Sequence, residues 1–97
     1  MKTSELTGAA LDWAVEQIDK PVWWHGKTYQ PSTNWAQGGP IIEREKIDIG
    51  PYRGAWRAAR HVSTTPIYGY GPTPLIAAMQ CYVASVLGED VELPEGL

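Results

Sequence analysis

The fold is decided by the stretch Thr73-Pro74-Leu75-Ile76-Ala77-Ala78-Met79-Gln80-Cys81-Tyr82-Val83-Ala84-Ser85-Val86-Leu87-Gly88. Thr73 can cap a helix, Pro74 suits its first position, and Gly88 suits the residue after its end. One broad apolar face is formed by Leu75, Ile76, Met79, Tyr82, Val83 and Val86. The opposite side carries small residues: Ala77, Cys81, Ala84 and Ser85. We therefore predict a helix over residues 74–87 that is buried on both sides and central to the fold.

An earlier helix is predicted over residues 7–19. Thr7 can cap its start, and Pro21 disfavours helical conformation in the residue before it. The core face follows helical spacing and consists of Leu11, Ala14, Val15 and Ile18. Trp13 lies on another side of this helix, so we expect it to pack beneath a loop of the same chain or against a second subunit.

Between the two helices the helical period disappears and turn residues separate short apolar runs. We predict a hairpin over residues 22–29, an ordered loop over 30–40, and short strands at 41–42, 47–49 and 67–70. Residues 53–61 fit either a strand or a helical turn. The expected fold is α+β: one domain over residues 1–97, with two helices (about 7–19 and 74–87) packed with a small, mostly antiparallel sheet of short strands. The acidic tail from Glu89 to Glu95 is expected to lie along the surface, anchored by Val91 and Leu93.

Composition excludes several classes of protein. The formal net charge of −3 argues against non-specific nucleic-acid binding, which needs a basic face. A single cysteine excludes an intramolecular disulfide framework, and no apolar run reaches the length of a membrane helix. Five Trp and five Tyr with no Phe favour half-buried positions, interfaces and ligand walls, because both rings carry a polar atom. We expect a soluble intracellular protein.

No catalytic constellation is evident in the sequence. His25 and His61 lack metal-ligand spacing, and Cys81 lies among apolar neighbours, which is typical of a core thiol. Glu43 and Glu45 would share a face of a strand and could act as an acid–base pair, but their basic neighbours favour an exposed charged segment. We predict no catalytic residue, no metal and no cofactor.

A binding site is easier to defend, because the segment from Tyr52 to Tyr70 has no acidic residue. It carries Tyr52, Arg53, Trp56, Arg57, Arg60, His61 and Tyr68. Arginine offers a planar fork to phosphate or carboxylate, and aromatic rings stack on flat groups. In the alternative interpretation, these arginines pair with the acidic tail and with Glu43, Glu45 and Asp48.

Two glycine-bearing segments, Gly38-Gly39-Pro40 and Gly71-Pro72-Thr73, could bring backbone amides to an anion, although turn geometry and helix capping explain them more simply, without a ligand. The predicted ligand-binding residues are Trp35, Gln37, Arg53, Trp56, Arg57, Arg60 and Thr73. The arginines would neutralise phosphates, the tryptophans would stack, and Gln37 and Thr73 would supply directional hydrogen bonds.

The segments Ser32–Glu45 (STNWAQGGPIIERE) and Gly71–Met79 (GPTPLIAAM) resemble the NinX-like proteins of tailed bacteriophages. The resemblance extends over nearly the whole chain and departs from the family pattern at Gln80, where that pattern has a basic residue. It implies a phage accessory protein made in the bacterial host cytoplasm, and it implies no particular reaction.

These observations lead to three functional hypotheses. The first is a non-enzymatic, homo-oligomeric binder that sequesters an anionic nucleotide-like ligand, such as a bacterial antiphage signal. The second is a protein-binding modulator of a host or phage enzyme, because Trp, Tyr and Arg also dominate protein interfaces. The third is a small hydrolase acting through Glu43, Glu45 or His61, which would require one of them to face a pocket.

Overall fold

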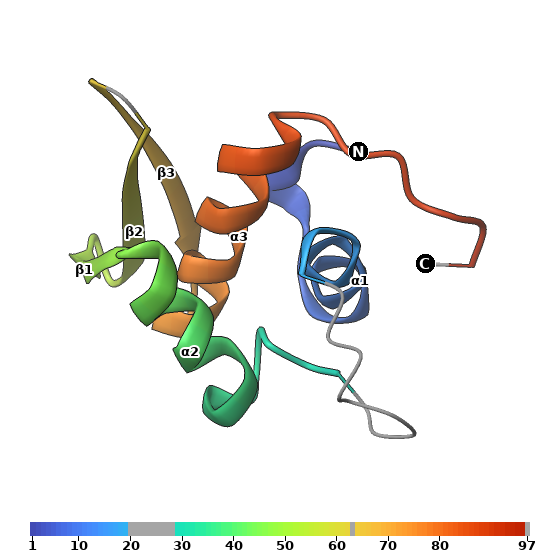
Figure 1. The fold of residues 1–97 in the computed structure, drawn as a ribbon, viewed down its shortest axis with the longest axis horizontal. Coiled ribbons are helices and arrows are strands. Elements are labelled where there is room, and N and C mark those ends of the chain that lie inside the picture. The colour runs from blue at the N-terminus through green and yellow to red at the C-terminus, as the bar shows by residue number, and fades with distance from the viewer. Residues whose placement is uncertain (20–28, 63, 97) are drawn as a thin grey trace.

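A computed structural model describes residues 1–19, 29–62 and 64–96 of the chain. The described elements are η1 (Thr3–Glu5), α1 (Gly8–Ile18), α2 (Trp35–Glu45), β1 (Asp48–Tyr52), β2 (Ala55–Val62), β3 (Thr65–Gly71) and α3 (Pro74–Leu87). Figure 1 shows α3 between α1 and the antiparallel sheet. The α+β prediction is confirmed, with one helix more than predicted. Most of the hairpin predicted over residues 22–29 lies outside the described residues.

The central helix α3 has the predicted ends. The Thr73 hydroxyl accepts a hydrogen bond from the Ile76 amide at 3.1 Å, and Gly88 follows the helix with a positive φ of 87°. Every residue from Ala77 to Val83 is buried, which agrees with burial on both sides. Val86 in the last turn is 48% exposed, so the apolar face ends earlier than predicted.

Helix α1 presents Leu11, Ala14 and Val15 to the core, as its spacing predicts. Thr7 occupies the capping position, but its side chain makes no capping hydrogen bond. Trp13 is half-buried and lines a hollow of about 270 Å³ together with Tyr29, Gln30 and Thr33. This tryptophan therefore lies beside a loop of its own chain.

The predicted loop over residues 30–40 is correct only as far as residue 34, and the predicted strand at 41–42 is wrong, because residues 35–45 form α2. The Asn34 side chain starts this helix by accepting a hydrogen bond from the Ala36 amide at 2.9 Å. Gln37 and Ile41, four residues apart on one face, are buried.

Tertiary packing explains why α2 forms despite Gly38, Gly39 and Pro40. A Cβ on Gly38 would overlap the Pro31 carbonyl oxygen and lie 2.6 Å from the Leu75 Cδ1, so this glycine permits close packing. Burial of the α2 face thus outweighs the low helix propensity of these residues. Consequently, the exposed loop amides expected from Gly38 to Pro40 are absent.

The three strands form a meander in the order β1–β2–β3. Residues 53 and 54 connect β1 to β2, and both have positive φ (50° and 80°), the requirement of a two-residue type I′ turn. The ambiguous segment 53–61 is thus mostly strand. In one row across the sheet, Asp48 lies opposite Ala59, which lies opposite Tyr68. In the next row on the same face, two residues along each strand, Gly50, Arg57 and Tyr70 are aligned in the same way.

The inner face of the sheet lies directly against α3. A Cβ added to Gly69 would overlap the Ala77 carbonyl oxygen and the Cys81 amide nitrogen, and would lie 2.8 Å from the Cys81 Cα. A Cβ on Gly71 would lie 2.6 Å from the Ile76 Cγ2. The helix backbone therefore approaches the backbone of β3 too closely for any side chain to intervene.

The carboxy-terminal segment pairs with the amino terminus. The Thr3 amide donates to the Glu89 carbonyl at 2.7 Å, and the Val91 amide donates to the Met1 carbonyl at 2.8 Å. Val91 is buried and Leu93 packs against the core, as predicted for the tail. Over the described ranges, no helix has the length and apolar character needed to cross a membrane.

We predict that Gly69→Ala lowers the free energy of unfolding by about 3 kcal/mol or more, because the added methyl overlaps the α3 backbone, which cannot move aside cheaply. Urea denaturation of both proteins measures the difference. Gly50→Ala is the matched control, since a Cβ on Gly50 meets nothing within 4 Å. Equal stability losses in the two variants would contradict the close contact between β3 and α3.

Candidate functional site

The outer face of the sheet carries exposed polar and aromatic side chains and is the candidate binding surface of the described fold. Alternation along β2 directs Ala58 and Arg60 toward α3, and directs Arg57 and His61 to the opposite side, where both are exposed. None of the described helices covers that opposite side, since the extensive helix–sheet contacts are all made by α3. We call it the open face.

Three tyrosines and two arginines form a cluster on the open face, which we call the tyrosine–arginine cluster: Tyr52, Arg53, Arg57, Tyr68 and Tyr70. The Arg57 guanidinium carbon lies 4.9 Å from the ring centre of Tyr52 and 5.1 Å from that of Tyr68. Arg53 lies 5.3 Å from the Tyr52 ring, and the Tyr52 and Tyr70 ring centres are 5.5 Å apart. These contacts hold the guanidinium groups against aromatic faces while their N–H edges remain available.

Beside this cluster the open face is hollowed, with a volume of about 340 Å³. The register explains the hollow, because Ala59 in the middle of one row and Gly50 at the β1 end of the other are too small to fill it. Around them stand Asp48 on β1, Arg57 and His61 on β2, and Tyr68 on β3. We call this concavity the open-face hollow, and it brings together a carboxylate, a guanidinium, an imidazole and a phenol.

The arginines of the acid-free segment have different surroundings. Arg60 faces α3, donates to the Ser85 hydroxyl at 2.7 Å, and forms an ion pair with Glu45 at 2.6 Å. Arg53 and Arg57 form no ion pair with any described residue. The alternative interpretation of arginines paired with Glu45 thus holds for Arg60 alone.

Glu45 is shared between two arginines at the junction of α2, β2 and α3. Its second oxygen accepts from Arg44 at 2.6 Å, and Arg44 also pairs with Asp19 at 2.9 Å and donates to the Tyr82 hydroxyl at 3.0 Å. Burial raises the pKa of Tyr82, so this phenol stays protonated over the neutral range. The network ties the end of α1 to α2, and α2 to β2 and α3.

The remaining predicted site residues lie away from the open face. Trp35 is 54% exposed at the start of α2. Gln37 is buried, and its side-chain oxygen accepts a hydrogen bond from the Gln30 amide. Trp56 packs against the core, and the Thr73 hydroxyl caps α3. Of the seven predicted residues, the structure therefore brings together only Arg53 and Arg57 in the tyrosine–arginine cluster.

A family model described as "Bacteriophage P22, NinX" matches residues 2–86. The chain belongs to this family. The match includes every residue of the tyrosine–arginine cluster and of the open-face hollow, so both features lie in the part of the chain that the family model covers. The comparison with curated proteins gave no match.

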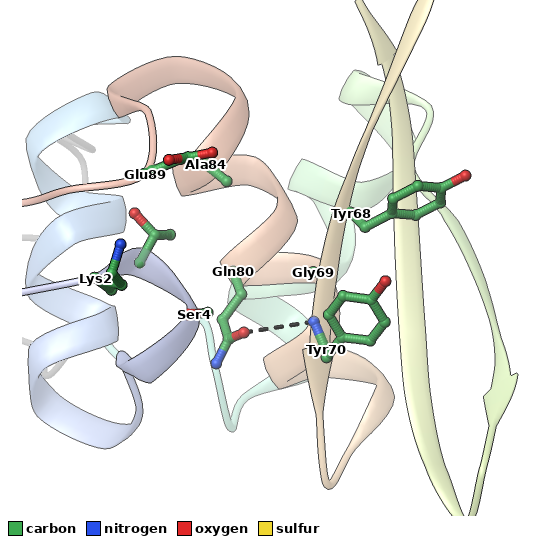
Figure 2. Close-up of a pocket in the computed structure, with 9 residues that line it drawn as sticks. Lys2, Ser4, Tyr68, Gly69, Tyr70, Gln80, Ala84 and Glu89 are labelled. Atoms are coloured by element: carbon green, nitrogen blue, oxygen red, sulfur yellow. Dashed lines mark hydrogen bonds between the residues drawn. The ribbon is translucent and has the colours of Figure 1, made fainter.

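A second hollow, about 310 Å³ in volume, lies where the amino terminus and α3 meet β3 (Figure 2). Gln80 lines this hollow. Its amide nitrogen donates to the Leu6 carbonyl at 2.8 Å, and its oxygen accepts from the Tyr70 amide at 3.4 Å (Figure 2). The Thr3 hydroxyl donates to the Gly88 carbonyl at 2.6 Å. Because these polar groups already bind one another, we assign this hollow a structural role.

The candidate catalytic groups are not arranged as an active site. Glu43 and Glu45 lie two residues apart on a helix, so they do not share a face, and the proposed strand pair is wrong. Burial raises the pKa of the Cys81 thiol to about 11, which agrees with a core residue. His61 does line the open-face hollow. The described residues include no group of three His, Cys, Asp or Glu side chains that could hold a metal ion.

The sequence indicated the arginines and some of the tyrosines, but it did not reveal Asp48, Gly50 and Ala59 as their neighbours. These residues are joined by the register of β1 with β2, which the Arg53-Gly54 turn sets. Recognition of that turn as a two-residue hairpin would have aligned Asp48 with Ala59 and Gly50 with Arg57.

We predict that Arg60→Ala lowers the free energy of unfolding by about 1–3 kcal/mol, because it removes charge-assisted hydrogen bonds to Glu45 and Ser85 in a partly buried site. Arg57→Ala removes the same side chain from the exposed face of the same strand and is expected to cost about 1 kcal/mol or less. Urea denaturation compares the two variants. A larger loss for Arg57→Ala would contradict this division of roles.

Proposed function

We propose that this phage protein is a non-enzymatic small-molecule binder that holds an anionic nucleotide-like ligand on the open face of its sheet. By retaining the ligand it would act as an accessory protein that withholds a nucleotide, such as an antiphage signal, from the host. The observation that carries the proposal is the pair of arginines, Arg53 and Arg57, which stack on tyrosine rings and form no ion pair with a described acid.

The positive groups support binding of an anion. In a chain with a net charge of −3, unpaired arginines next to one another attract a phosphate to this face. Stacking on Tyr52 and Tyr68 limits the orientations of the Arg57 guanidinium, so less conformational entropy is lost on binding. This charge distribution suits a small anion better than a long nucleic-acid backbone, which needs a basic surface of larger extent.

The aromatic groups support a ligand with a flat ring. Tyr68 and Tyr70 are each 43% exposed, although large side chains in a small domain are usually buried where the fold permits. A nucleobase stacked on such a ring gains about 1–3 kcal/mol, irrespective of base sequence. The combination of exposed rings with unpaired guanidinium groups is therefore suited to a nucleotide.

The shape of the open face favours a small ligand over a protein partner. A ligand site is concave and directs several polar groups inward, whereas a protein interface is flatter. The open-face hollow has a volume near the lower end of ligand pockets, and Asp48, Arg57 and His61 converge on it. Edge-to-edge pairing of the sheet is disfavoured, because Pro51 and Pro66 lie in the two edge strands and have no amide hydrogen.

The alternative function is a hydrolase in which His61 acts as the general base, since this residue lines the open-face hollow. A general base normally has a partner that orients its ring. Among the described side chains, His61 has no hydrogen-bond partner. Binding without turnover is therefore the stronger proposal.

Native mass spectrometry of the purified protein with mono-, di- and cyclic nucleotides tests it. We expect an intact nucleotide to be retained, and the same spectra give the oligomeric state, which we expect to be a homo-oligomer. A cleaved product would instead favour the hydrolase. A bare protein across the whole panel would contradict the proposal and direct attention to a protein partner.

Arg57→Ala is expected to weaken binding of the retained nucleotide about tenfold or more, because it removes a charged donor from the site. Lys2→Ala is the matched control: it also removes one positive charge, but from the hollow at the β3 edge. Titration calorimetry measures both. If only Lys2→Ala weakened binding, the ligand would lie in the hollow at the β3 edge, and the proposal would be contradicted.

A further inference from the structure

The open-face hollow has charges of both signs on its rim, and this restricts what it can bind. Asp48 lies opposite Ala59, so its diagonal neighbours on β2 are Arg57 and His61. No described ion pair contains Asp48 or Arg57, and both residues are exposed. A ligand group in the hollow therefore meets a carboxylate on the β1 side and a guanidinium on the β2 side, and neither group is engaged in a described ion pair.

A phosphate does not satisfy this pair, because the Asp48 carboxylate would repel it. The group in the hollow must instead offer donors toward β1 and acceptors toward β2. It must also be flat, since Tyr68 presents its ring beside the hollow. These three requirements describe a nucleobase with its donors and acceptors on separate edges.

Guanine meets these requirements better than the other common bases. Its N1–H and N2 amino group are adjacent donors that a carboxylate can accept from with both oxygens. Its O6 and N7 are adjacent acceptors, and a bidentate arginine is the most frequent specific contact to them. Adenine presents an acceptor, N1, where the carboxylate needs a donor, and its N6 amino group faces the arginine with hydrogens. Cytosine offers the carboxylate a single amino group.

We propose that the open-face hollow is a guanine site, in which Asp48 accepts from N1–H and the N2 amino group, Arg57 donates to O6 and N7, and Tyr68 stacks on the base. Arg53, which lies against Tyr52 beyond the hollow, is then left for the phosphate. The inference rests on the proposed function, because it assumes that a nucleotide binds to the open face. It names the base, which the arginines and tyrosines alone do not determine.

Titration calorimetry with GMP, IMP and AMP tests the guanine site. The wild-type protein is expected to bind GMP at least about tenfold more tightly than AMP, since AMP forms neither bidentate pair. IMP lacks only the N2 amino group and is expected to lie between the two. Asp48→Asn is expected to weaken GMP binding about tenfold and to bring the affinities of GMP and AMP together, because the amide accepts at one atom only.

Glu16→Gln is the matched control: it makes the same change of charge on α1, which packs against α3 on the side away from the sheet. It should leave all three affinities unchanged. Thermal unfolding of each variant identifies any loss of fold, which we do not expect from the exposed Asp48.

The outcomes separate the two proposals. Equal affinities for GMP and AMP, or a preference for AMP, would overturn the guanine site while nucleotide binding stands. A preference for GMP that persists in Asp48→Asn would also overturn the guanine site, because the Asp48 carboxylate would then not determine which base binds. Absence of binding by every nucleotide would overturn both the guanine site and the proposed function.

Discussion

The structure depends on the direct contact between the backbone of β3 and the backbone of α3 at Gly69. No side chain fits between them, so positions 69 and 71 on the inner face of β3 must be glycine, and the residue opposite Gly69 on β2 is the small Ala58. Because side chains alternate along a strand, glycine at 69 and 71 places Tyr68 and Tyr70 on the other face. The constraint that holds the helix on the sheet thus also exposes the aromatic rings of the candidate site.

A second consequence concerns the arginines of β2. Arg60 points inward and is neutralised by Glu45, whose other oxygen binds Arg44, so this junction fixes α2 beside the sheet. Arg57, three residues earlier, points outward, where no described acid pairs with it. One acid-free segment therefore supplies both an ion-paired inward arginine and an outward arginine without a described ion pair, because side chains alternate between the two faces along the strand.

The elements with strong local signals were predictable from the sequence. Thr73, Pro74 and Gly88 specify both ends of α3 without help from the rest of the fold. Helix α2 was not predictable in this way, because Gly38, Gly39 and Pro40 favour a loop and only contact with Pro31 and Leu75 favours a helix. The candidate site was predictable in part: composition identified Arg53 and Arg57, whereas Asp48 and the hollow depend on a strand register set by an arginine in a turn position that usually holds asparagine or aspartate.

The proposed guanine site lies on the sheet's open face and not in the hollow at the β3 edge. A ¹H–¹⁵N NMR titration of the whole chain with GMP tests this most directly, because both regions are observed in one spectrum. We expect the amide signals of Gly50, Arg57 and Ala59 to shift while those of Ser4 and Gln80 remain in place. Shifts centred on Ser4 and Gln80, or a spectrum that GMP leaves unchanged, would contradict it.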